Sequence, residues 1–292
     1  MIPSLLIFIL AAQESAPTSR PAPEKRLEVR EVRNLPYYSG PGADPVRNRL
    51  DLYLPEGGKK FPFLLFFHGG AWMFGRKEIA THVGRALAAR GIGVAAANYR
   101  LSPAVKHPEH ARDAARAFAW LEAHAREYGG DPARLFAGGH SAGGHLAALL
   151  ALDGKYLEEV GRSKRDLRGA IAMSGAFELP PRGLNRVFPD DPEKRRDAEP
   201  ASRVGEDAPA FLVVVAEGDL TDLREQGERM RARLEEKGVP VEFFLAEGKT
   251  HVSEFRDVGA PGDGTTEALV RFLLHPPERK RPTAETRPAA RF

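Results

Sequence analysis

The segment Gly139–Gly143, with the sequence Gly-His-Ser-Ala-Gly, constrains the fold of this chain more than any other feature. An apolar run at 135–137 precedes it, and a helix-like stretch at 145–152 follows it. In a G-x-S-x-G pattern the serine lies on a sharp strand-to-helix turn, where small flanking residues avoid collision with the neighbouring strand and helix. The sequence therefore predicts a nucleophile elbow with Ser141 as the nucleophile.

The chain around this turn alternates short apolar runs with longer helical patterns. Strands are expected at 63–67, 92–97, 134–137, 169–173, 211–216 and 241–245, and helices at 78–90, 109–128, 143–152, 222–237 and 264–274. Such alternation builds a parallel sheet with helical crossovers. Two alternating stretches at 27–35 and 49–54, joined by a Gly/Pro-rich turn at 39–45, predict an antiparallel pair. The expected fold class is α/β, with a mostly parallel central sheet, an antiparallel N-terminal pair and helices on both faces.

The N-terminal segment differs in composition from the rest of the chain. Residues 1–12 contain an apolar run that is too short for a membrane span but suits the central region of a signal peptide. Residues 13–25 are rich in Ala, Pro, Ser and Thr and resemble a linker. We therefore expect a periplasmic or secreted protein, with a cytoplasmic one as the alternative.

One catalytic domain is expected at 26–275. Within it, residues 177–209 contain many prolines and a charge run without clear periodicity, which predicts an inserted loop over the site. Residues 276–292 are rich in Pro and Arg and are expected to form a disordered tail.

Composition excludes several classes of function. The chain has no cysteine, so disulfides, thiolate catalysis and cysteine-ligated metals are ruled out. Its 43 basic and 40 acidic residues give a net charge of only +3, which argues against nucleic acid as a partner. No phosphate-binding loop or dinucleotide fingerprint is present, so we expect neither cofactor nor metal. No stable membrane anchor is expected, and the oligomeric state is left open.

A serine nucleophile needs a general base and an acid that orients the base. Asp219 and His251 each follow an expected strand, and open α/β sheets place their sites at such carboxyl ends. Asp222 is the rival acid, but it occupies a plausible helix N-cap, where Asp is favoured for reasons unrelated to catalysis. Glu217 is a third candidate. We favour Asp219 because it lies directly at the strand end.

The oxyanion that forms during acyl transfer also needs hydrogen-bond donors. The amide after the nucleophile, that of Ala142, is one expected donor. The second source is the loop His68-Gly69-Gly70-Ala71-Trp72 after the strand at 63–67. Its glycines, Gly69 and Gly70, let main-chain amides approach a developing alkoxide. Trp72 is interpreted either as a wall of the substrate pocket or as a core residue.

Two histidines, His140 and His145, flank the candidate nucleophile. Their spacing does not suit a pair of metal ligands on one helix face, so packing or pocket-lining roles are expected.

Four motifs together resemble the α/β-hydrolase esterases. They are His-Gly-Gly-x-Trp at 68–72, Asn-Tyr-Arg-Leu-Ser-Pro at 98–103, Gly-Asp-Pro at 130–132 and Gly-His-Ser-Ala-Gly-Gly-His at 139–145. The most similar groups are the hormone-sensitive-lipase-like carboxylesterases, the bacterial feruloyl-esterase-like enzymes and the kynurenine formamidases. The resemblance implies the α/β-hydrolase fold and a triad of Ser141, Asp219 and His251, with Gly69, Gly70 and Ala142 in the oxyanion region.

The chain departs from the lipase-like group at two positions. That group usually has a third glycine where this chain has Ala71, and its acid commonly lies in Asp-Pro-Leu where this chain has Asp219-Leu220-Thr221. Both departures favour the feruloyl-esterase and formamidase groups.

The activity implied by the resemblance is hydrolysis of a small-molecule carboxylic ester with a small or short-chain acyl group, through an acyl-enzyme. Two alternatives stay open. An amide hydrolase, such as an arylformamidase or a small peptidase, would use the same triad. A non-catalytic α/β-hydrolase scaffold would be expected to lack a triad residue, whereas this chain has a candidate for each.

Overall fold

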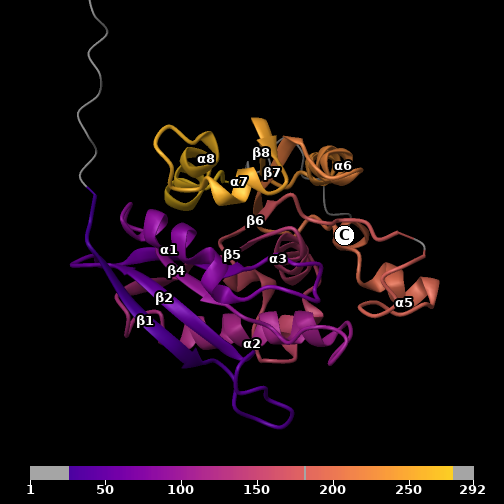
Figure 1. Cartoon of the computed structure of the whole chain (residues 1–292), viewed down its shortest axis with the longest axis horizontal. Helices are drawn as coiled ribbons and strands as arrows, with labels where there is room; N and C mark the ends of the chain where they lie inside the picture. The colour runs from indigo at the N-terminus through magenta and orange to yellow at the C-terminus, as the bar shows by residue number, and fades with distance from the viewer. Residues whose placement is uncertain (1–25, 181, 279–292) are drawn as a thin grey trace, which may run out of the picture.

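A computed structural model describes residues 26–180 and 182–278 (Figure 1). Eight strands form one sheet in the order β1-β2-β4-β3-β5-β6-β7-β8. The strands are β1 (Val29–Pro36), β2 (Arg49–Pro55), β3 (Phe61–Phe67), β4 (Gly93–Ala97), β5 (Gly130–His140), β6 (Gly169–Met173), β7 (Ala210–Gly218) and β8 (Val241–Thr250). β2 pairs antiparallel with β1 and β4, and the other pairs are parallel. The predicted fold class is confirmed.

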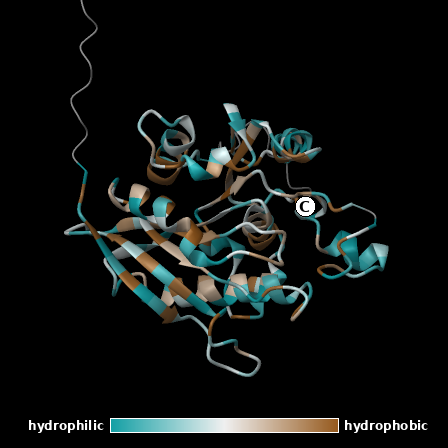
Figure 2. Ribbon diagram, viewed as in Figure 1, coloured by the Kyte–Doolittle hydropathy of each residue, from teal (hydrophilic) through white to brown (hydrophobic). Residues whose placement is uncertain are grey.

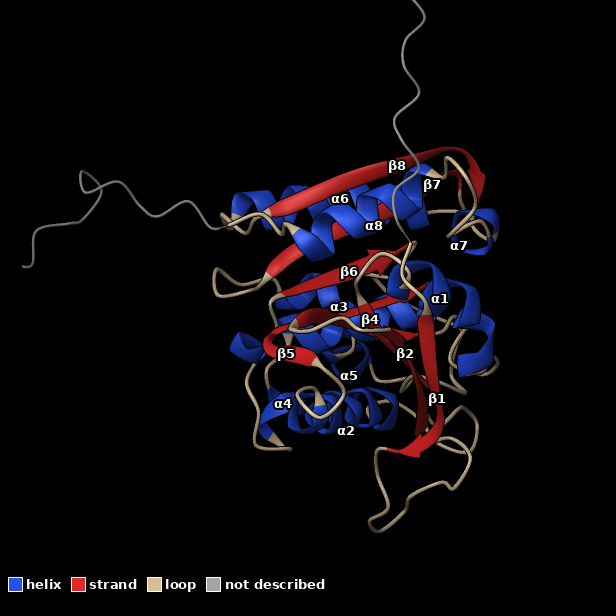
Figure 3. Ribbon diagram, turned by 90° about the vertical axis from the view of Figure 1, so that its left-hand side faces the viewer, coloured by secondary structure: helices blue, strands red, loops and turns tan. Residues whose placement is uncertain are grey.

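Helices cover both faces of the sheet (Figure 3). β1 and β8 are its two edge strands. The α-helices are α1 (Thr81–Ala88), α2 (Glu109–His124), α3 (Ala142–Leu152), α4 (Lys155–Glu158), α5 (Pro192–Asp197), α6 (Leu223–Glu236), α7 (Ser253–Arg256) and α8 (Gly264–Leu274). Three 3-10 helices are η1 (Lys77–Ala80), η2 (Lys164–Asp166) and η3 (Pro200–Arg203).

Strand β3 shows why the sequences of the central strands are continuous apolar runs. Every residue of β3 is buried, because its alternate side chains enter two different cores. Phe63, Leu65 and Phe67 pack in the core that contains α2, α3 and α6. Leu64 and Phe66 pack in the core that contains α1, α7 and α8.

Helix α3, which follows the candidate nucleophile, is buried along its whole length. A helix that is apolar all round has no face suited to water, so it is stable only in the interior. By contrast, the charged helices α5 and α6 are mostly teal in Figure 2, as expected of helices at the surface. Burying each leucine of α3 stabilises the fold by about 1.5–3 kcal/mol, so the elbow rests on a firmly packed element.

The structure corrects several predicted boundaries. The helix expected at 78–90 is divided into η1 and α1. β5 begins at Gly130, before its predicted start, and β8 continues to Thr250. The last part of β8 pairs with β7 only after a register shift, where Gly218 lies opposite Thr250. This irregularity interrupts the apolar pattern, so the pattern predicted too early an end for the strand.

The segment 177–209, expected to be a loop, contains the short helices α5 and η3. Asp191 caps α5 by accepting a hydrogen bond from the Lys194 amide (3.0 Å), and proline occupies its first turn. The Asp191 cap and the proline were local signals for α5, but this helix is too short to show periodicity. The predicted signal peptide at 1–12 and the linker at 13–25 lie outside the described residues, as does most of the predicted tail.

Candidate active site

Ser141 lies in the turn between β5 and α3 with a backbone of φ +55° and ψ −119°. Few non-glycine residues adopt such a conformation, and it costs on the order of 1–3 kcal/mol. The surrounding backbone holds it in place. The Ser141 amide donates to the Met173 carbonyl (2.8 Å), and the Ser141 carbonyl accepts from the His145 amide (3.0 Å).

Gly143 shows how closely the elbow packs on the sheet. A Cβ atom at this position would lie 2.0 Å from the Phe67 carbonyl oxygen and 2.8 Å from that of His68. No side chain fits at such distances, so glycine is required for α3 to begin against the end of β3.

The loop after β3 lies next to the elbow. A Cβ atom on Gly69 would be 3.3 Å from the Ser141 Cβ. Gly70 has a φ of +121°, and a Cβ there would meet the Phe74 carbonyl oxygen at 2.3 Å. Ala142 is the first residue of α3, so its amide has no acceptor within the helix. The backbone of Gly69 and the first amide of α3 thus lie next to Ser141, where the sequence predicts oxyanion donors.

Ala71 and Trp72 continue this loop with φ values of +50° and +58°. Ala71 therefore adopts the left-handed conformation that the usual third glycine would adopt without strain. The Trp72 side chain is only 4% exposed and packs edge-on against His145 and Phe188. Its indole N–H donates to His145 Nδ1 (3.3 Å), so of the two interpretations of Trp72 the structure favours a core residue.

Asp219 and His251 form the hydrogen-bonded pair expected of an acid and a base. Asp219 follows β7, His251 follows β8, and the two atoms His251 Nδ1 and Asp219 Oδ1 are 2.7 Å apart. Asp219 Oδ1 also accepts from the Leu220 amide (2.8 Å), and Oδ2 accepts from the Ser174 hydroxyl. Burial alone would raise the pKa of Asp219, but the hydrogen bonds from His251 and Ser174 outweigh it and hold the pKa below its usual range.

The two rival acids, Asp222 and Glu217, form hydrogen bonds with groups other than His251. Asp222 stands at the start of α6, but its side chain makes no cap hydrogen bond, which corrects the predicted cap. It accepts instead from Gln226 Nε2 (3.0 Å) and from Arg229 (3.1 Å). Glu217 accepts from the Gly248 amide (2.7 Å) and so ties the end of β7 to β8.

His140 and His145 have packing roles, in agreement with the expectation. The His140 ring lies 4.6 Å from the His251 ring, and its Nε2 donates to the His251 carbonyl (2.8 Å). His140 directly precedes Ser141, so this contact brings the candidate base to the elbow. His145 Nε2 donates to the Ala198 carbonyl (2.8 Å) and ties α3 to the inserted segment. Burial lowers the pKa of His140 to about 3 and that of His145 to about 4.

Two side chains near the Asp219–His251 pair, Ser174 and Glu254, were not predicted from the sequence. Ser174 follows β6 directly, so its place at the carboxyl end of a strand was a usable signal. Glu254 lies in α7, three residues after His251, and is fully buried. No sequence pattern marked Glu254, because a lone glutamate after a loop normally faces water.

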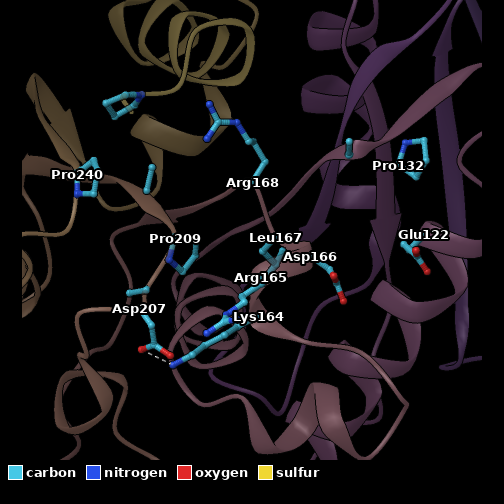
Figure 4. Close-up of a pocket in the computed structure, with 14 residues that line it drawn as sticks. Glu122, Pro132, Lys164, Arg165, Asp166, Leu167, Arg168, Asp207, Pro209 and Pro240 are labelled. Carbon is cyan, nitrogen blue, oxygen red and sulfur yellow. Dashed lines mark hydrogen bonds and ion pairs between the residues drawn. The ribbon is translucent and has the colours of Figure 1, made fainter. Parts of the chain in front are cut away.

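A pocket elsewhere on the molecule contains none of these residues. Figure 4 shows it lined by Leu167 and Arg168 before β6, Pro209 before β7 and Pro240 before β8. It therefore lies at the amino ends of the strands, opposite the site. Among the described residues there is no cluster of three or more potential metal ligands and no helix long and apolar enough to cross a membrane.

The fold and this constellation are those of the α/β-hydrolases. The family described as BD-FAE matches residues 50–174. Carboxylic ester hydrolase LipN of Mycobacterium tuberculosis is 31% identical over 287 residues, covering 87% of this chain and 72% of LipN. This similarity to LipN shows that the chain belongs to a family of α/β-hydrolase carboxylic ester hydrolases, and the predicted resemblance is confirmed.

Two other proteins illustrate the breadth of the similarity. Probable isoprenylcysteine alpha-carbonyl methylesterase ICMEL1 of Arabidopsis thaliana is 30% identical over 239 residues, which cover 73% of this chain but only 50% of ICMEL1. This chain thus spans about half the length of that relative. Esterase B from Lactobacillus rhamnosis shares the fold, with a TM-score of 0.72 at 22% identity, over 86% of this chain and 88% of the esterase.

Proposed function

We propose that this protein hydrolyses small carboxylic esters with short acyl groups through a triad of Ser141, His251 and Asp219. The observation that carries the proposal is the Asp219–His251 hydrogen bond (2.7 Å) beside the strained elbow. Membership of a carboxylic ester hydrolase family supports the reaction class.

The first half-reaction is acylation of the serine. His251 Nε2 accepts the Ser141 hydroxyl proton as the oxygen attacks the ester carbonyl, and Asp219 stabilises the imidazolium that forms. The amides of Gly69, Gly70 and Ala142 stabilise the oxyanion. His251 then returns the proton to the departing alcohol.

In the second half-reaction water attacks the acyl-enzyme, with His251 again accepting the proton, and the carboxylic acid is released. None of these steps calls on a cofactor or a metal. We further propose that the protein works in the periplasm or outside the cell, on the evidence of the apolar segment at residues 1–12.

Matched substrates test the proposed activity. A series of p-nitrophenyl esters of increasing acyl length should show the highest kcat/KM for the short members, and Ser141→Ala should abolish turnover above background. The corresponding p-nitroanilides are the comparison. Faster hydrolysis of anilides than of esters would make the protein an amide hydrolase, and no hydrolysis of either would favour a binding scaffold.

A further inference from the structure

Glu254 is a fully buried carboxyl group, and within residues 26–180 and 182–278 no lysine or arginine pairs with it. Neither of its oxygens accepts a hydrogen bond among the described residues. In the part of the chain that the structure describes, the basic group within ion-pair range is the imidazole of His140, with Nε2 3.8 Å from Glu254 Oε1, and burial keeps His140 neutral. The neighbouring Phe255 stacks on His140 at 5.0 Å between ring centres, so this wall of the site is apolar.

The Ser174 hydroxyl and the carboxylate of Asp219 also lie near enough to influence the pKa of Glu254. Burial raises the pKa of Glu254 well above its usual range, and the charge of Asp219 adds to this effect, although Ser174 acts in the opposite direction. The nearby charged side chains Lys249 and Arg256 both pair with Asp257, and Lys249 also pairs with Asp263, so neither cation compensates Glu254. A buried acid in such surroundings takes up a proton rather than remain ionised.

The Ser174 hydroxyl has a single proton, and it donates this proton to Asp219 Oδ2. Its oxygen is then left as an acceptor for a further donor. A protonated Glu254 is such a donor, whereas an ionised Glu254 would compete with Asp219 for the Ser174 proton.

We propose that Glu254 is a positioning residue of the Asp219–His251 pair: as a carboxylic acid it donates to Ser174 Oγ and so keeps the Ser174 proton directed at Asp219. This inference rests on the proposed triad. The series of donors, Glu254 to Ser174 to Asp219, ends on the carboxylate that orients His251. It fixes the hydrogen bond from Ser174 to Asp219 Oδ2 without adding a second negative charge beside the base.

Three variants separate positioning from packing. Glu254→Gln keeps a donor of the same shape, so kcat/KM and its pH profile should stay within about threefold of wild type. Glu254→Leu and Ser174→Ala each remove the donation, so kcat should fall about tenfold, with KM nearly unchanged, and the acid limb of the profile should move. Because Glu254 and Ser174 act in series, the double variant that combines Glu254→Leu with Ser174→Ala should be no slower than the slower of these two single variants.

Two spectroscopic measurements do not require turnover, so they distinguish failure of this inference from failure of the proposed activity. The infrared difference spectrum between wild type and Glu254→Gln at neutral pH should contain the carbonyl band of a protonated carboxylic acid. The low-field NMR signal of the His251 Nδ1 proton should move in Ser174→Ala but not in Glu254→Gln. The Ser174→Ala and Glu254→Gln arms suffice if Glu254→Leu fails to fold.

If the infrared difference spectrum contained carboxylate bands from Glu254 in place of the carbonyl band, that result would overturn the proposal. So would a Glu254→Gln variant as slow as Glu254→Leu, additive losses in the double variant, or wild-type behaviour of all three variants.

Discussion

At the scale of single residues, the two oxygens of Asp219 have different partners. Oδ1 faces His251 and the Leu220 amide, whereas Oδ2 faces Ser174. A carboxylate held by donors on both sides stays ionised and fixed in orientation, which is what an imidazole needs from its acid partner. Asp222 has no such role, since its partners, Gln226 and Arg229, lie on its own helix.

Exchange of each acid for its amide therefore separates the two candidates. Asp219→Asn removes the negative charge facing His251 and allows the wrong tautomer, so kcat should fall by about 10³- to 10⁴-fold. Asp222→Asn is the matched control, and it should change kcat less than about twofold and stability by less than about 0.5 kcal/mol. Steady-state kinetics on a short-chain ester give the comparison, and the opposite ranking would assign the acid role to Asp222.

The residue types and their spacing were sufficient to predict the elbow and the candidates for acid and base. They were not sufficient to choose among Glu217, Asp219 and Asp222, because all three lie within six residues after the predicted strand at 211–216. Only the fold decides which carboxylate reaches His251. Ser174 was missed although it directly follows a predicted strand. Glu254 escaped prediction because burial of a glutamate depends on the packing of α7 against the sheet, which no local pattern records.

At the scale of elements, the junction of β3 and α3 fixes the site. Apolar runs and helical periodicity predicted these elements, since each buries a continuous set of side chains. Periodicity could not predict η1, α5 or η3, because one or two turns are too short to show it. Their ends depend on caps and on contacts distant in sequence.

Gly143→Ala tests this junction. The added methyl group would lie 2.0 Å from the Phe67 carbonyl oxygen, so α3 or β3 must shift, at a cost of about 1–3 kcal/mol or more. Thermal unfolding should show a lower Tm, and ester hydrolysis should fall steeply because the elbow moves. Gly154→Ala is the control, since Gly154 has a φ of −62° and ordinary space around it. Equal effects of the two substitutions would show that the junction is not tight.

At the scale of the whole molecule, buried histidines link the fold to pH. Burial lowers the pKa of five of them to about 3 or 4; they are His68, His107, His110, His140 and His145. In the unfolded chain the same side chains titrate near pH 6.5. Between these values the unfolded state binds more protons than the folded state, so the free energy of unfolding decreases as the pH falls below about 6.5.

The expected slope is about 1.4 kcal/mol per pH unit for each proton taken up on unfolding. Urea unfolding at pH 7.5, 6.0 and 5.0 should therefore give free energies that fall progressively, with the loss beginning near about pH 6.5. His145→Gln should reduce this dependence by up to one proton, provided that the variant folds. A free energy of unfolding that is constant from about pH 7.5 to 5.0 would contradict the assignment of neutral buried histidines.

The account as a whole depends on Ser141 as the nucleophile, and covalent labelling tests this most directly. The protein is treated with a fluorophosphonate, digested and analysed by mass spectrometry. We predict a single phosphonylated site at Ser141, formed at a rate that Asp219→Asn slows strongly and Asp222→Asn leaves unchanged. A label on any other residue, or no label on a folded protein, would contradict the proposed mechanism.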